Sequence, residues 1–184
     1  GDVKNIFKKS ITKPSDEDVV SVIGRNASSR WYSAVRRTIK ALLNSPIIVY
    51  YLGSATDLIH PLLITDGDIF LFVDIDECYR CTADSILKNI SKQIDKLGGK
   101  LINSKIVGIE QIVVTFKLGG KDRVLHYYNR IDASNEEMLP KKVKEGFDIY
   151  VEKALLTGYT GSGINKALAL PIGINYLREG GFIF

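Results

Sequence analysis

The sequence predicts an α/β fold, in which a mostly parallel sheet is flanked by helices and carries an inserted antiparallel hairpin. Two observations lead to this prediction. Apolar runs rich in β-branched and aromatic residues, such as residues 47–52 and 69–73, alternate with segments of helical period, as in parallel sheets covered on both faces. Two further β-rich runs, residues 112–117 and 123–128, flank a glycine-containing turn, which indicates a hairpin.

The chain is organised around residues 47–76. The first strand of this unit ends at Gly53, four small or polar residues follow, and the second strand ends in Asp74, with Asp76 two positions later. This is the layout of a nucleotide-binding α/β unit, in which the turn lets a ligand approach the backbone and the acid accepts hydrogen bonds from ribose hydroxyls. The alternative is an ordinary βαβ unit without a ligand, because one glycine is a weaker signal than G-x-G-x-x-G.

The other expected elements continue this alternation. Residues 58–64 are short and apolar and contain Pro61, which predicts a brief helix or a turn as the first crossover. Further strands are expected at residues 101–107, 147–151 and 182–184, with a polar loop through residues 135–140. Helices are expected at residues 15–23, 29–43, 83–97 and 164–177, the last kinked or split by Pro171.

The helix at residues 29–43 is predicted to be amphipathic. Its apolar stripe, which we expect to face the core, consists of Trp31, Val35, Ile39 and Leu42. The basic residues on the rest of its surface are Arg30, Arg36, Arg37 and Lys40. A solvated charged face is favoured over a surface that binds phosphate groups.

Composition indicates an ordinary globular protein with one main domain. The chain has 184 residues, of which 45% are hydrophobic and 25% charged, and we expect an N-terminal arm with a short helix at 1–28 and a domain at 29–184. Neither a run of about 20 apolar residues nor a signal-type start is present, so a cytoplasmic protein without a membrane partner is expected. The mild net charge of +4 does not indicate a nucleic-acid partner.

Two cysteines, Cys78 and Cys81, are spaced C-x-x-C after the second strand. A zinc site would need two more ligands, and only His60 and His126 are available, so no metal is expected. A thiol redox pair at the start of a helix is one interpretation. Two reduced structural thiols in a cytoplasmic environment are favoured over it.

Five landmarks, taken in order, carry a resemblance to a known family. They are Gly53-Ser54-Ala55-Thr56-Asp57, Asp74-Ile75-Asp76, Asp132-Ala133, Phe147-Asp148-Ile149-Tyr150-Val151 and Leu177-Arg178-Glu179-Gly180-Gly181. Residues 29–184 thereby resemble a class I S-adenosylmethionine-dependent methyltransferase, which implies a Rossmann-like fold. The resemblance implies S-adenosylmethionine as the cofactor and an unknown methyl acceptor, with the protein positioning the nucleophile at the sulfonium methyl.

The same resemblance implies the cofactor-binding residues. The loop at 53–57 approaches the ligand, Asp74 takes the ribose with Ile75 and Asp76 beside it, and Asp132 and Ala133 meet the adenine. Glu152 lines the expected ligand edge, where a surface ion pair with Lys153 is an equal interpretation. No catalytic residue is implied.

The sequence also departs from the family pattern. Tyr51 stands where an acid is usual, Ala55 replaces the second glycine and Asp57 the third, so the glycine loop is degenerate. Asp57 is then the candidate for the methionine amine, and Ala55 costs little if its dihedral angles are ordinary. The pattern stops at the fifth strand of seven, which fits a truncated domain, a sheet completed by a partner such as a second copy, or a domain that remains partial. A non-catalytic ligand-binding or interaction domain is the alternative function, ahead of a thiol redox protein.

Overall fold

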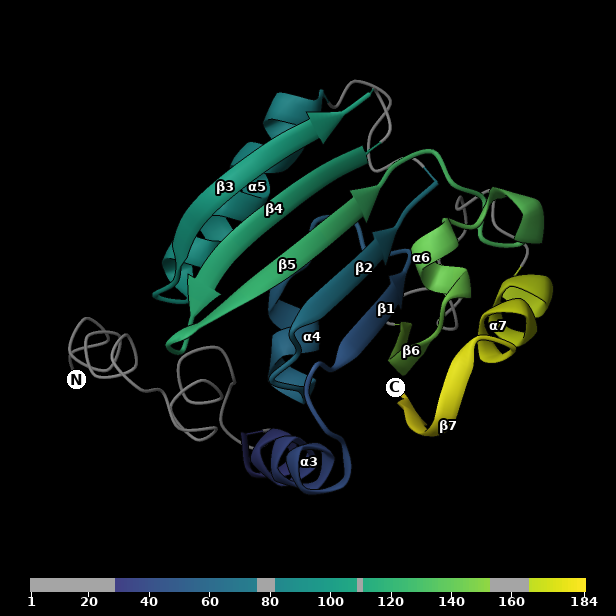
Figure 1. Cartoon of the computed structure of the whole chain (residues 1–184), viewed down its shortest axis with the longest axis horizontal. Coiled ribbons are helices and arrows are strands. Elements are labelled where there is room, and N and C mark those ends of the chain that lie inside the picture. Colours follow the sequence, from purple (N-terminus) through teal and green to yellow (C-terminus); the bar gives the residue numbers. More distant parts are fainter. Residues whose placement is uncertain (1–28, 76–81, 109–110, 153–165) are drawn as a thin grey trace.

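The computed structural model describes residues 29–75, 82–108, 111–152 and 166–184, and these form a single seven-stranded sheet with helices on both faces (Figure 1). The strand order is β3-β4-β5-β2-β1-β6-β7. The strands are β1 (Ile48–Leu52), β2 (Ile69–Val73), β3 (Lys100–Val107), β4 (Gln111–Leu118), β5 (Lys121–Tyr128), β6 (Phe147–Glu152) and β7 (Leu177–Ile183).

Five of the strands are parallel and two form an antiparallel extension. β5, β2, β1, β6 and β7 run in the same direction, whereas β4 is antiparallel to both β5 and β3. The predicted mostly parallel sheet and its hairpin, β4 with β5, are therefore confirmed. β1 lies between β2 and β6 in the interior of the sheet, as its almost unbroken run of buried residues requires.

Helices α3 (Ser29–Leu42), α4 (Ile59–Ile64) and α5 (Ala83–Lys96) share one hydrophobic core with the sheet. The strongest of them, α5, begins with a capping box between Thr82 and Ser85 and buries Ile86, Ile90 and Ile94 at helical spacing. Helices α6 (Lys141–Lys144) and α7 (Lys166–Ile174) pack on the other face with a second core, which contains Tyr50, Leu71 and Tyr150. Among the described helices, none is long and apolar enough to cross a membrane.

The face of α3 that meets the core differs from the predicted stripe. Trp31 and Leu42 are 54% and 66% exposed, whereas Arg36 is 3% exposed. Arg36 can be buried because its guanidinium donates to the carbonyl of Leu62 and lies 3.9 Å from a carboxylate oxygen of Asp66. The prediction of a solvated basic face was therefore wrong at Arg36. Hydropathy alone predicts an exposed arginine, but an arginine whose charge and N–H groups are paired can be buried.

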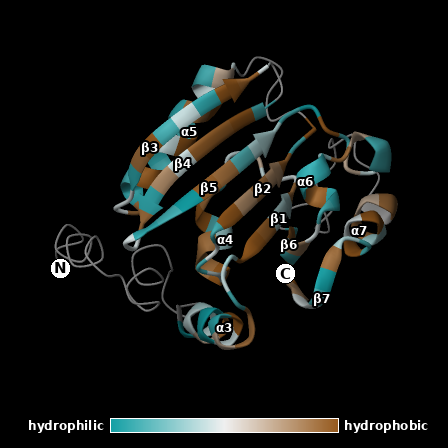
Figure 2. Ribbon diagram, in the orientation of Figure 1, coloured by the Kyte–Doolittle hydropathy of each residue, from teal (hydrophilic) through white to brown (hydrophobic). Residues whose placement is uncertain are grey.

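A second buried arginine completes an ionic network at the amino-terminal edge of β1 and β2. Arg123, also 3% exposed, lies 2.5 Å from Asp66 and donates to the carbonyls of Gly67 and Leu118. Lys121 pairs with Asp68 at 2.8 Å. β5 begins with Lys121, Asp122 and Arg123, so its start is hydrophilic, in contrast to most of β4 (Figure 2). Burial alone would raise the pKa of Asp66, but the three cations hold that pKa below its usual value.

Three smaller predictions also changed. Pro171 lies inside α7 without splitting it. β7 starts at Leu177, so Gly180 and Gly181 lie within the strand and not before it. The pairing of β7 with β6 shifts register in this part of the strand. The expected polar loop at residues 135–140 contains a 3-10 turn, Glu136–Met138, before α6. The first predicted helix, at residues 15–23, and the cysteine pair lie outside the described residues.

Candidate functional site

The carboxyl ends of β5, β2, β1 and β6 meet at one edge of the sheet because these strands are parallel. Leu52 is in register with Val73 of β2 and with Glu152 of β6, and Val73 is in register with Tyr128 of β5. The residues that follow these strands therefore lie at nearly one level. The structure thus brings the loop after Gly53, Asp74 and Glu152 to the same edge, as the sequence predicted.

The loop after β1 is held in an unusual backbone conformation. Gly53 has a φ of 60° and its N–H donates to the carbonyl of Val73 at 2.8 Å. Ala55 has a φ of 46°, in the left-handed region where a Cβ is unfavourable. The dihedral angles of Ala55 are therefore not ordinary, and the missing second glycine carries a conformational cost. Ser54 and Thr56 are buried beside them.

Asp74 ties this loop to two neighbouring strands. Its side chain is buried, and Oδ2 accepts the backbone N–H of Ala55 at 2.6 Å. Its own N–H donates to the carbonyl of Tyr128 at 3.0 Å, and its carbonyl accepts the N–H of Ile131 at 2.9 Å. Asp74 is thus a structural support for the loop as well as the predicted ribose ligand. Ile75 follows it within the described part of the chain, whereas Asp76 lies outside.

Asp57 is engaged within the protein. Its Oδ2 accepts the hydroxyl of Tyr51 at 3.0 Å, and its Oδ1 accepts the N–H of His60 at 3.2 Å. Burial first, and then the Asp57 carboxylate, raise the pKa of Tyr51, so the hydroxyl remains a donor. Tyr51 thereby fixes Asp57 over the start of α4.

Asp132 and Ala133 lie in the turn after β5. Asp132 Oδ1 accepts both the backbone N–H of Ser134, at 2.9 Å, and its hydroxyl, at 2.5 Å. Ala133 is buried in the core beneath α6. The carboxylate of Asp132 therefore shapes its own turn through one oxygen, and the methyl group of Ala133 serves packing.

Glu152 is the most unusual side chain at this edge. The residue is 9% exposed, and neither of its carboxylate oxygens has a hydrogen-bond partner among the described residues. Its interpretation as a member of a surface ion pair was therefore wrong, because the side chain is buried. An unpaired buried carboxylate is costly, and a bound ligand, ion or water molecule would offset that cost.

Asn129 is a site residue that the sequence reasoning missed. It follows β5 directly, is 6% exposed, and its Oδ1 is buried without a hydrogen-bond partner in the described part of the chain. The rule that selected Asp74, the first polar residue after an apolar strand, would also have selected Asn129. Within the same described residues, no group of three or more His, Cys, Asp or Glu side chains is arranged to hold a metal ion.

Comparisons of the chain with protein-family models, curated proteins and solved structures gave no match.

Proposed function

We propose that the chain binds S-adenosylmethionine at the carboxyl edge of its sheet and is a methyltransferase on a Rossmann-like fold, with an unknown acceptor. The observation that carries the proposal is the reversal of strand order at β1. From β1 the chain continues to β2 and β5 on one side, and then returns to β6 and β7 on the other. Ligands of open α/β sheets bind in the crevice at such a reversal.

The side chains at this crevice fit an adenosyl ligand in part. Gly53 lacks the Cβ that would separate the backbone from a ligand, and Asp74 is an acid at the end of β2 that would accept the ribose hydroxyls. Its hydrogen bond with Ala55 uses Oδ2 and so connects the loop and the acid into one unit. Asp132 and Ala133 follow β5, on the side where the adenine is expected.

The ammonium group of the methionine tail fits Glu152 better than Asp57. Asp57 already accepts hydrogen bonds from Tyr51 and His60, whereas the oxygens of Glu152 are buried and unpaired among the described residues. A charge-assisted hydrogen bond from an ammonium group would satisfy such a carboxylate. S-adenosylmethionine supplies an electrophilic methyl group when bound. The protein's own residues hold and orient the two partners and exclude water.

Calorimetric titration with S-adenosylhomocysteine tests the proposal. Asp74→Asn keeps an oxygen for the N–H of Ala55 but loses the charge, so it should fold like the parent and bind about 10- to 100-fold more weakly, where 1.4 kcal/mol is tenfold. Asp74→Ala should bind as weakly and also lose stability. Asp122→Ala removes an exposed carboxylate near the start of β5; it is the matched control and should bind like the parent.

Two results would refute parts of this assignment. If Asp74→Asn and Asp132→Ala both bind S-adenosylhomocysteine as tightly as the parent, the adenosyl site is elsewhere. If the parent does not bind at about 1 mM ligand, which corresponds to roughly −4 kcal/mol, the methyltransferase proposal fails. The alternative is then a non-catalytic binding domain, which is favoured by the engagement of Asp57 and Asp132 within the protein.

A further inference from the structure

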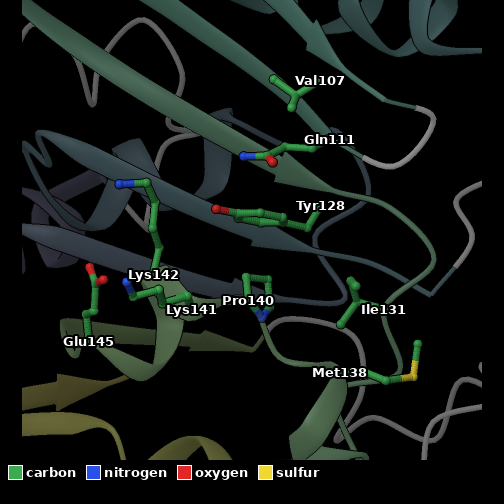
Figure 3. Close-up of a pocket in the computed structure, with 9 residues that line it drawn as sticks. All are labelled: Val107, Gln111, Tyr128, Ile131, Met138, Pro140, Lys141, Lys142 and Glu145. Atoms are coloured by element: carbon green, nitrogen blue, oxygen red, sulfur yellow. The ribbon is translucent and has the colours of Figure 1, made fainter.

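A pocket of about 570 Å³ opens between α6 and the face of β3, β4 and β5 (Figure 3). It is on the side of the sheet away from α5, because Gln111 and Tyr128 line it while their strand neighbours Ile112 and Tyr127 belong to the α5 core. Its volume falls within the range of roughly 300–1,000 Å³ typical of small-molecule sites. Its lining does not include Gly53, Asp74 or Glu152.

The two ends of the pocket differ in polarity. Figure 3 shows the amide of Gln111, the hydroxyl of Tyr128 and the ammonium of Lys142 directed toward one end, with Ile131 and Met138 at the other. The polar end presents hydrogen-bond donors from three separate elements, which are β4, β5 and α6. The other end and the ring of Tyr128 offer apolar surface that suits a flat molecule.

The charges at the pocket favour a ligand with one negative charge. Two lysines, Lys141 and Lys142, and one carboxylate, Glu145, line it, which leaves one positive charge in excess. Burial first, and then Glu145, raise the pKa of Tyr128, so its hydroxyl is protonated and can donate. A phosphate group would carry a second negative charge, which Glu145 would repel. A carboxylate carries only one negative charge and therefore fits the pocket better.

His126 lies beside the polar end of the pocket, and one of its ring nitrogens lacks a hydrogen bond among the described residues. Its ring stacks on that of Tyr128 with 6.3 Å between centroids, and Nδ1 is buried without a hydrogen-bond partner among the described residues. Burial and the charge of Lys142 lower the pKa of His126 to about 4, so the ring is neutral at pH 7. His126 does not line the pocket itself, but its contact with Tyr128 puts a neutral imidazole next to the polar end.

We propose that this pocket is a second binding site, for a small aromatic carboxylate. The ring system would lie against Tyr128, Pro140 and Ile131, and the carboxylate would accept hydrogen bonds from Lys142, Gln111 and the hydroxyl of Tyr128. The proposal goes beyond the adenosyl site and does not depend on it.

The experiment is a titration of the whole chain with 2-naphthoate, followed by calorimetry and by the histidine ring signals in proton NMR spectra. The chain has two histidines, so the signal of His126 should shift while that of His60, on α4, stays constant. The neutral isostere 2-naphthamide should bind at least about fivefold more weakly, since it lacks the charge-assisted hydrogen bonds.

Matched lysine variants on α6 test the position of the carboxylate. Lys142→Met should weaken 2-naphthoate about five- to tenfold, whereas Lys144→Met, an exposed lysine outside the pocket lining, should change it less than about twofold. The proposal is overturned if the parent does not bind at about 5 mM, a concentration at which even weak pockets fill. Equal binding of the amide, or equal effects of the two lysine variants, would overturn it as well.

Discussion

Replacing Glu152 by methionine should stabilise the protein and weaken the binding of the proposed adenosyl ligand. Methionine has nearly the same length as glutamate, and it would put apolar atoms where two carboxylate oxygens are buried without partners in the described part of the chain. The substitution tests whether Glu152 lowers the free energy of unfolding while it increases the affinity for the ligand.

The size of the effect follows from the burial of Glu152. Leaving a buried polar group without a hydrogen bond costs about 1–3 kcal/mol in mutational data, and the residue is 9% exposed. The free energy of unfolding should therefore rise by about 1–3 kcal/mol in Glu152→Met. For a chain of 184 residues, that corresponds to an increase in Tm of roughly 2–12 °C.

Urea unfolding of the ligand-free protein, compared with calorimetric titration of S-adenosylhomocysteine, measures the two effects separately. The free energy of unfolding should rise while the affinity falls about tenfold or more. Glu179→Met, at an exposed position of β7, is the control and should stay within about 0.5 kcal/mol of the parent. A Glu152→Met protein less stable than the parent would show that the carboxylate is paired in solution, and the reasoning would fail.

Three further substitutions test other parts of the fold. Ala55→Gly should stabilise by about 1 kcal/mol, because its φ of 46° suits glycine; a urea midpoint below that of the parent would contradict this. Asp66→Asn should cost about 2–3 kcal/mol at pH 7 by depriving buried Arg123 of its counter-charge. The lowered pKa of Asp66 means that this contribution is present above about pH 4 and lost below it, so urea midpoints of the two proteins should converge in acid, and a constant gap would refute the ion pair. Gly173→Ala should destabilise by about 1–3 kcal/mol, because the added Cβ would clash with the ring of Tyr150; thermal unfolding should show a smaller loss in a Tyr150→Leu background, and an equal loss would argue against the clash.

The strands and the edge at which they end were predictable because both follow from residue type. Apolar β-branched and aromatic runs such as β1 and β2 have few alternatives in a buried sheet, and an acid directly after such a run must lie at the strand end. Asp74 and Glu152 were therefore found from sequence. Their different circumstances, one bonded to Ala55 and the other unpaired in the described residues, depend on distances between segments that no local pattern encodes.

The face of α3 could not be predicted in full because burial of a charge depends on a distant partner. The helical period of the apolar residues favoured Trp31 and Leu42 as core residues. Arg36 is buried instead, because its guanidinium pairs with Asp66 and donates to a carbonyl of α4. The left-handed conformation of Ala55 was hidden for a similar reason. Alanine usually has a negative φ, so the sequence gives no sign of the positive φ of Ala55. The hydrogen bond from its N–H to Asp74, a residue distant in sequence, accompanies this conformation in the folded structure.

The alternation of side chains along the strands sets a minimum length for any ligand that both acids contact. Tyr150 and Val73 pack in the core under α6 and α7, so Glu152, two residues after Tyr150, points to that face, while Asp74, one residue after Val73, points to the other. β2, β1 and β6 are successive neighbours, which separates the two positions by two strand spacings, or about 10 Å. A nucleoside held at Asp74 is too short to reach Glu152, whereas an adenosyl group with an amino-acid tail can pass over the end of β1 and touch both. If the proposed adenosyl site is correct, this edge of the sheet would select ligands by their length as well as by their charge.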